Sequence, residues 1–113
     1  MVSAGCVKKN TSGCSSQKGM TWLTDRYQKK FVVKNECIYC YNVIYNADPV
    51  MLPDQKQKIE ELHPCALRLA FSSEKADTVK EILRMYEDVF RRNKNVSMPE
   101  KGYTRGHFKR GVK

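Results

Sequence analysis

The sequence predicts an α/β fold in which a cysteine-bearing loop and a β-hairpin precede two strand–helix units and a basic tail. Residues 37 to 45 ("CIYCYNVIY") are dense in aromatic and β-branched side chains, as buried strands are. Residues 74 to 92 repeat apolar side chains at steps of three and four, which is the period of a helix packed on one face. The 113 residues suit one small domain or part of a larger one.

The N-terminal third of the chain predicts a loop and then a hairpin. Residues 1 to 20 are rich in Gly, Ser and Lys and show no periodicity, so we expect a loop that needs something to order it. In "TWLTDRYQKKFVV" (21 to 33), apolar residues flank the polar "DRYQKK". This pattern is typical of a hairpin whose loop is longer than two residues.

The middle of the chain predicts two strands and a short helix. The first strand covers 37 to 46 and has its two cysteines at its beginning, where the backbone still turns. Pro53 is a favoured first helical residue and opens a helix over 53 to 62. "CALRLAF" (65 to 71) alternates weakly and predicts a second buried strand. With the helix that follows, these elements predict parallel pairing and a right-handed crossover.

The helix over 74 to 92 has start and stop signals as well as an apolar face. Ser73 is a candidate cap, and Asp77 lies near the positive end of the helix dipole. Arg91 and Arg92 lie near its negative end. The expected apolar face consists of Val79, Ile82, Leu83, Tyr86, Val89 and Phe90.

Positive charge is concentrated at the C-terminal end. The net charge is +9, and residues 91 to 113 hold eight Lys and Arg against one acidic residue. Residues 93 to 101 predict an exposed connector. In "GYTRGHFKRGVK" (102 to 113), aromatics alternate with cations, which suits stacking on bases and contact with phosphates. There are two alternatives: a solvated end, or a tail that folds back toward a substrate site. The three glycines favour the tail that folds back, because they let the backbone approach its surroundings closely. The candidate RNA or substrate contacts are Tyr103, Arg105, His107, Phe108 and Arg110.

Composition narrows the class of protein. No run approaches the roughly 18 consecutive apolar residues of a membrane helix, and no basic segment with an apolar stretch precedes Cys6 as in a signal peptide. Five cysteines, an odd number, argue against a disulfide framework and for a reducing compartment. We therefore expect a cytoplasmic protein with no membrane partner.

Four cysteines have the spacing of a metal site. Cys37 and Cys40 form a C-x2-C pair, whose short turn lets both thiolates face one metal ion. Cys6 and Cys14 are more loosely spaced, but as ligands they would order the first 20 residues. Four thiolates suit zinc or an iron–sulfur cluster, and spacing does not separate these. Cys65, inside the apolar segment 65 to 71, is expected to be a buried small hydrophobe.

Two other uses of the cysteines are less favoured. A dithiol redox pair would place C-x2-C at a helix N-terminus, whereas a strand is expected after Cys40. A catalytic Cys–His pair with His63 or His107 lacks a local motif that positions the histidine, and a hydrogen-bonded turn is the commoner role for His63. Unrelated free thiols complete the alternatives.

Three segments resemble the C-terminal part of the collagenase-like peptidase family, the U-thirty-two group: "TDRYQKKFVVKNECIYCYNVIYN", "ALRLAFSSE" and "YTRGHFKRGV". The resemblance runs over nearly the whole chain. Members of that family are several times longer and begin with most of a β/α barrel. The resemblance therefore implies that residues 1 to 92 are a C-terminal fragment ending in the last strand–helix units of a barrel, with 93 to 113 as a basic glycine- and aromatic-rich tail.

The resemblance also implies chemistry. Some family members take part in oxygen-independent hydroxylation of RNA bases or quinones, with four cysteines that hold an iron–sulfur cluster. The matching positions here are Cys6, Cys14, Cys37 and Cys40, which favours an iron–sulfur cluster over zinc. The family's catalytic residues are not agreed, and "peptidase" is its label. We expect an enzyme piece that is inactive without the rest of a larger barrel protein or a partner chain. The alternative is a free-standing, metal-stabilised RNA-binding module.

Overall fold

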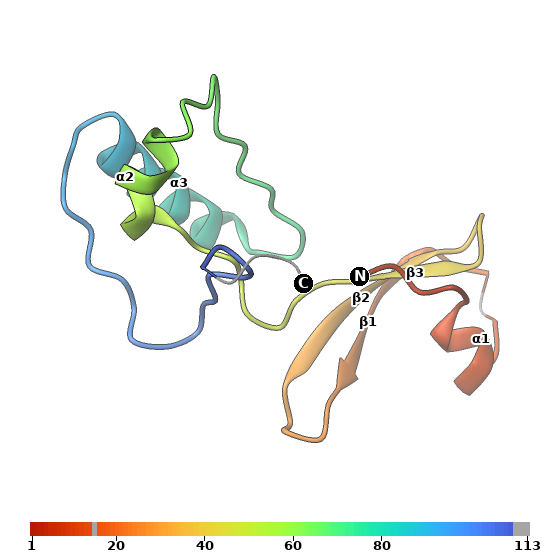
Figure 1. Ribbon diagram of the computed structural model, residues 1–113. Helices are drawn as coiled ribbons and strands as arrows, with labels where there is room; N and C mark the ends of the chain where they lie inside the picture. The colour runs from red at the N-terminus through yellow and green to blue at the C-terminus, as the bar shows by residue number, and fades with distance from the viewer. Residues whose placement is uncertain (15, 110–113) are drawn as a thin grey trace. The chain divides into compact units, whose positions relative to one another are not determined.

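The computed structural model describes residues 1–14 and 16–109 and divides into two compact units (Figure 1). We call Met1–Ala47 the N-terminal unit and Asp48–Lys113 the C-terminal unit. Composition and the resemblance suggest a boundary between residues 92 and 93, whereas the contacts divide the chain between residues 47 and 48.

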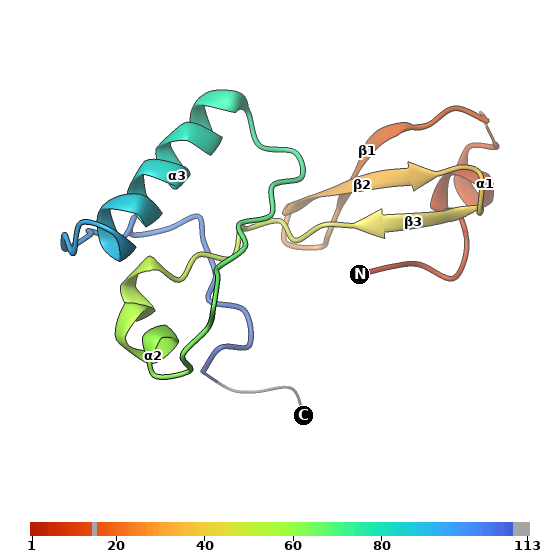
Figure 2. The same cartoon turned by 90° about the horizontal axis from the view of Figure 1, so that it is seen from above.

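The N-terminal unit is built on a three-stranded antiparallel sheet. Strands β1 (Gly19–Thr24), β2 (Lys30–Glu36) and β3 (Tyr41–Ile44) lie in the order β1-β2-β3 (Figure 2). The predicted hairpin is confirmed, because β1 pairs with β2 across a loop over 25–29. The side chain of Asp25 closes this loop: its Oδ1 accepts hydrogen bonds from the amides of Tyr27 at 2.8 Å and Lys29 at 2.9 Å.

One face of this sheet carries three of the buried residues of β2 and β3, and Val32 is buried on the other face. Val33 pairs with Ile44 and Asn35 with Asn42, so all four side chains point to the same face. Val33, Asn35 and Asn42 are buried there. Trp22 pairs with Val32 on the opposite face and is 63% exposed. The sheet therefore has one face that mixes apolar and amide groups.

The first 14 residues are attached to the outer edge of β3. Val2 forms an isolated antiparallel bridge with Val43, and the short helix α1 (Val7–Thr11) follows. Figures 1 and 2 both show α1 at the end of the sheet where β2 runs into β3. The expected loop is thus partly ordered by pairing with the sheet.

The C-terminal unit contains a 3₁₀ turn and two helices. The turn η1 (Pro53–Gln55) leads into α2 (Lys56–Glu60), and α3 (Ala76–Phe90) follows after an irregular segment. Both predicted helices are confirmed. Their shared core consists of Met51, Pro53, Ile59 and Val89.

Polar contacts hold α3 against the turn. The Tyr86 hydroxyl accepts a hydrogen bond from the Leu52 amide at 2.9 Å, and its ring stacks on Phe90 with 6.0 Å between centroids. The Lys56 ammonium donates to the Val89 carbonyl at 3.1 Å, near the end of α3 where carbonyls lack intrahelical partners.

Several predictions about the middle of the chain are wrong. Residues 65 to 71 are irregular, because a strand needs a paired neighbour and every strand of the described sheet belongs to the N-terminal unit. The parallel pairing expected between the strands over 37–46 and 65–71 is therefore absent from the described residues, and β3 pairs instead with β2, in the antiparallel sense. The structure is therefore a mixed α/β chain with a small antiparallel sheet.

The details of α3 also differ from expectation. Ser73 does not cap it; Lys75 is the N-cap residue, and no side chain caps the helix. The Glu74 carboxylate instead accepts hydrogen bonds from the amides of Ser72 and Ser73 at 2.6 and 3.0 Å. On the expected apolar face, Val89 is buried but Leu83 is 46% exposed. Within the described residues, no helix has both the length and the apolar character needed to cross a membrane.

Candidate cysteine site and basic tail

The C-x2-C pair occupies the turn between β2 and β3. β2 ends at Glu36 and β3 begins at Tyr41, and the Tyr39 amide donates to the Glu36 carbonyl at 3.2 Å. Cys40 has a left-handed backbone with φ of 53°. Cys37 and Cys40 therefore stand at the two ends of a tight turn, which is the backbone arrangement that a C-x2-C metal pair requires.

The thiol of Cys37 is linked to the segment that leads into β1. Its Sγ donates to the Gln17 carbonyl at 3.1 Å, and Gly19 pairs with Asn35 in the sheet. Gln17 lies three residues after Cys14, so this contact brings the Cys14 segment to the same end of the sheet as the turn.

Cys6 lies at the same end of the sheet, because the next residue, Val7, is hydrogen-bonded to the buried side-chain amide of Asn42. Asn42, two residues after Cys40, accepts a hydrogen bond at Oδ1 from the Val7 amide at 2.6 Å. The side chain of Asn42 is fully buried, and its Nδ2 donates to Asn35 Oδ1 at 2.6 Å. Cys6, the N-cap residue of α1, is thereby held beside the start of β3.

Cys14 is exposed, and its neighbours lower the pKa of its thiol. Hydrogen bonds from Ser16, first from its backbone and then from its side chain, lower the pKa of the Cys14 thiol, and the positive charges of Lys9 and Lys8 act in the same direction. The Cys14 Sγ and the Ser16 Oγ are 3.7 Å apart. A thiol in such surroundings reaches the thiolate form, which is the metal-binding form, at a lower pH.

The four predicted ligands share one unit and one end of one sheet, but they do not converge on a single point. Among the residues that the structure describes, no three His, Cys, Asp or Glu side chains are grouped so that they could hold a metal ion. The donor set itself fits a thiolate-bound metal or cluster: four cysteines from three neighbouring segments, with two lysines near Cys14 to offset negative charge.

Cys65 and His63 lie in the C-terminal unit. The prediction that Cys65 is buried is wrong: it is exposed, because the segment around it forms no strand. His63 lies in the turn after α2, where its amide donates to the Glu60 carbonyl at 2.9 Å and its φ is 49°. The side chain of His63 is exposed, as is that of His107.

The tail folds back onto residues 49 to 51 within its own unit. The Thr104 amide donates to the Pro49 carbonyl and the Met51 amide to the Thr104 carbonyl, each at 2.9 Å. Thr104 thereby forms a parallel bridge with Val50. Gly106 has a φ of +56°, and a Cβ there would lie 3.7 Å from the Val50 side chain, so the backbone conformation calls for glycine more than the space does.

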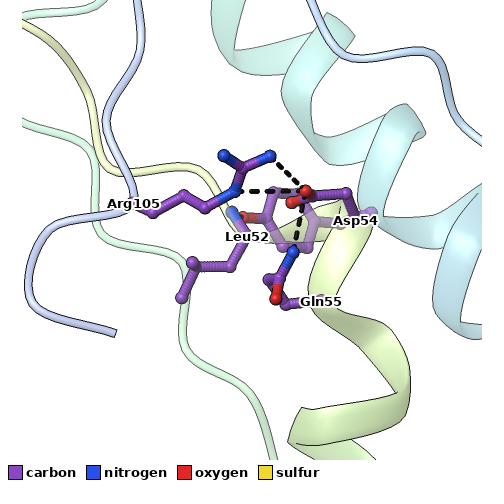
Figure 3. Close-up of polar contacts among 5 residues, drawn as sticks. Leu52, Asp54, Gln55 and Arg105 are labelled. Atoms are coloured by element: carbon purple, nitrogen blue, oxygen red, sulfur yellow. Dashed lines mark hydrogen bonds and ion pairs between the residues drawn. The ribbon is translucent and has the colours of Figure 1, made fainter. Parts of the chain in front are cut away.

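An ion pair fastens the same contact (Figure 3). Arg105 Nε donates to Asp54 Oδ2 at 3.1 Å, Arg105 Nη2 donates to the same oxygen, and Gln55 Nε2 donates to it at 2.8 Å. The Arg105 guanidinium also lies 5.5 Å from the centroid of the Tyr103 ring. The hydrogen bonds from Arg105 hold the pKa of the Asp54 carboxyl below its usual range.

Beside the tail lies a hollow of about 480 Å³. It is lined by Glu100, Tyr103, Thr104, Arg105, Gly106 and Lys109. Of the five predicted tail contacts, Tyr103 and Arg105 line this hollow, and Phe108 is half-buried in a turn in which its amide donates to the Arg105 carbonyl. Arg110 lies outside the described residues.

Two residues that organise these sites, Asn42 and Asp54, are not among the residues predicted from the sequence. Asn42 lies within the apolar run "CIYCYNVIY", and a polar residue inside a buried strand is the signal that could have identified it. Asp54 gave no such signal, because its partner Arg105 is 51 residues away. Comparison of the chain with family models, with curated proteins and with solved structures gives no match.

Proposed function

We propose that the chain is the C-terminal, iron–sulfur-bearing region of a protein of the collagenase-like peptidase family, with Cys6, Cys14, Cys37 and Cys40 as the cluster ligands. The observation that carries this proposal is the common location of the four thiols. Cys37 and Cys40 frame the β2–β3 turn, Cys37 contacts the segment after Cys14, and Asn42 holds the segment of Cys6 beside the start of β3.

Coordination would complete this arrangement. Metal binding and local folding are coupled wherever ligands come from segments that have little other reason to order. The residues around Cys6 and Cys14 are of this kind, since α1 has no buried residue. An iron–sulfur cluster would supply electron transfer, and zinc, the alternative occupant, would supply structural stability alone. Five cysteines without a disulfide are typical of a reducing compartment, which supports a cytoplasmic location.

The C-terminal unit supports a larger parent protein. Leu62, Leu67 and Leu83 are 75%, 45% and 46% exposed, and residues 65 to 71 form no strand although their composition suits one. The rest of a β/α barrel, from the same polypeptide or a partner chain, would pair with 65 to 71 and cover these side chains. The activity, whether peptidase or oxygen-independent hydroxylation of RNA or a quinone, would then belong to the assembled protein.

Serine substitution of each cysteine tests the ligand set. We expect Cys6→Ser, Cys14→Ser, Cys37→Ser and Cys40→Ser each to lose most of the bound metal after anaerobic purification, and Cys65→Ser, the matched control, to retain it. Metal content per chain is the measurement. Loss of metal in Cys65→Ser together with retention in Cys6→Ser would show that the ligand set is wrong.

A second candidate function is RNA binding by the tail. The observation in its favour is the hollow lined by an aromatic ring and two cations, Tyr103, Arg105 and Lys109. Against it, Arg105 is already paired with Asp54, so RNA would have to compete with that carboxylate. Binding of labelled single-stranded RNA at two salt concentrations tests it. Arg105→Ala should reduce the slope of log affinity against log salt concentration by about one, the value for one lost phosphate contact. Tyr103→Ala should weaken RNA binding without changing this slope, because stacking is not a charge interaction.

A further inference from the structure

Little apolar burial anchors residues 1 to 14. Met1 and Val2 are 81% and 64% exposed, and α1 has no buried residue. The position of Cys6 relative to the β2–β3 turn therefore depends on polar contacts with β3.

Those contacts converge on one residue. The Ser3 amide donates to the Asn42 carbonyl and the Asn42 amide donates to Ser3 Oγ, each at 2.9 Å. The Val7 amide donates to Asn42 Oδ1 at 2.6 Å. Farther along the edge, the Ile44 amide donates to the Met1 carbonyl at 2.7 Å. Asn42 is thus the residue that contacts the N-terminal segment on both sides of Gly5, through its backbone and its side chain.

The orientation of the Asn42 amide is fixed by burial. Its side chain is fully buried, and its Nδ2 donates to Asn35 Oδ1, which is itself an acceptor only. The amide group therefore directs Oδ1 toward Val7. Reversing it would face two acceptors toward each other and leave a buried donor without a partner, which is costly.

We infer that Asn42 is a positioning residue for the proposed cysteine site: it holds the Cys6 segment beside the start of β3, two residues after Cys40, so that a metal centre can recruit ligands from both segments. This inference rests on the proposed function. Asn42 would act like the hydrogen bonds that orient ligands at metal sites without touching the metal. Loss of such hydrogen bonds lowers metal affinity by about 10- to 100-fold.

The Val7 amide offers a sharp test, because it can be removed without altering the sheet. Val7 is the first residue of α1, where proline is favoured, and Cys6 has the extended backbone (φ −80°, ψ 117°) that a residue before proline adopts. Val7→Pro deletes the N–H that Asn42 accepts. Val7→Ala shortens the same side chain, keeps the N–H and serves as the matched control.

Anaerobic titration of the full chain with cobalt(II) gives both affinity and a spectroscopic signature, since thiolate-to-cobalt absorbance rises with the number of thiolate ligands. We expect Val7→Pro and Asn42→Ala to bind cobalt about 10- to 100-fold more weakly, with reduced thiolate absorbance. Val7→Ala should match the wild type. In the Cys6→Ser background, Asn42→Ala should add little, because both changes remove the same ligand.

Each contrary result has a distinct meaning. Wild-type affinity and absorbance in Val7→Pro would overturn the positioning role while leaving the metal site in place. Independent, additive effects of Asn42→Ala and Cys6→Ser would overturn it too, because Asn42 would then act through the sheet as a whole. A wild-type chain that binds no cobalt through its thiols and takes up no iron and sulfide on anaerobic reconstitution would overturn the proposed function, and the positioning role with it.

Discussion

At the scale of single residues, hydrogen bonding decides how the cysteines and the tail behave. The thiol of Cys14 is exposed yet has a lowered pKa, because Ser16 and nearby lysines stabilise its thiolate. The Asp54 carboxyl has a lowered pKa because Arg105 and Gln55 donate to it. The first effect favours the thiolate form of Cys14, and the hydrogen bonds behind the second attach the tail to its own unit.

We predict that Cys14 reacts with iodoacetamide at lower pH than an ordinary thiol in the metal-free chain. Thiolate is the reactive form, and the Ser16 hydrogen bonds favour it. Ser16→Ala, which removes the side-chain hydrogen bond, should slow the reaction at Cys14. Labelling followed by peptide mass analysis over a pH series measures the rate. Metal loading should protect Cys14 and leave Cys65 reactive; protection of both would contradict the proposed ligand set.

We predict that acid weakens attachment of the tail. The pKa of Asp54 is lower in the folded chain than in the unfolded chain, so the stabilisation is complete above the unfolded value of about 3.9 and is lost as pH falls through the folded value. Hydrogen exchange of the Thr104 amide, corrected for the intrinsic pH dependence, should lose protection in that window. Asp54→Asn should show reduced protection already at neutral pH. Equal protection of the Thr104 amide in the wild type and in Asp54→Asn at neutral pH would mean that the ion pair does not hold the tail.

At the scale of elements, burial separates the apolar residues of the C-terminal unit that form its core from those that remain exposed. Ile59 on α2 and Val89 on α3 are buried within the C-terminal unit, whereas Leu83 on α3 and Leu67 in the irregular segment are about half exposed. The apolar face of α3 is therefore used only in part within its own unit.

We predict that Ile59→Ala destabilises the chain by roughly 2–5 kcal/mol, the usual cost of a large-to-small change in a core. Leu83→Ala should cost well under half as much, because about half of that side chain already contacts solvent. Urea unfolding followed by helix circular dichroism measures both. Equal losses in the free energy of unfolding would contradict this, because they would mean that Leu83 is covered in solution.

At the scale of the whole molecule, the elements that depend on neighbouring residues were predictable from the sequence, whereas contacts between distant residues were not. The hairpin and the helices over 53–60 and 76–90 follow from turn residues and apolar periodicity, which act within a few residues. The strand expected over 65–71 failed because a strand depends on a neighbour, and none is paired with it in the described chain. The partners of Asn42 and Asp54 lie 35 and 51 residues away, so a local pattern can at most mark Asn42 as a polar residue in an apolar run and cannot identify the residue that it contacts.

The content of iron, acid-labile sulfide and zinc per chain, measured after anaerobic purification, tests the central claim most directly. A four-cysteine cluster site predicts iron and sulfide in comparable amounts, with little zinc. One zinc per chain without sulfide would mean that the four thiolates form a metal site, but that its occupant is zinc and not a cluster. A folded chain that contains neither iron nor zinc, and takes up neither on anaerobic reconstitution, would contradict the claim that Cys6, Cys14, Cys37 and Cys40 form a metal centre.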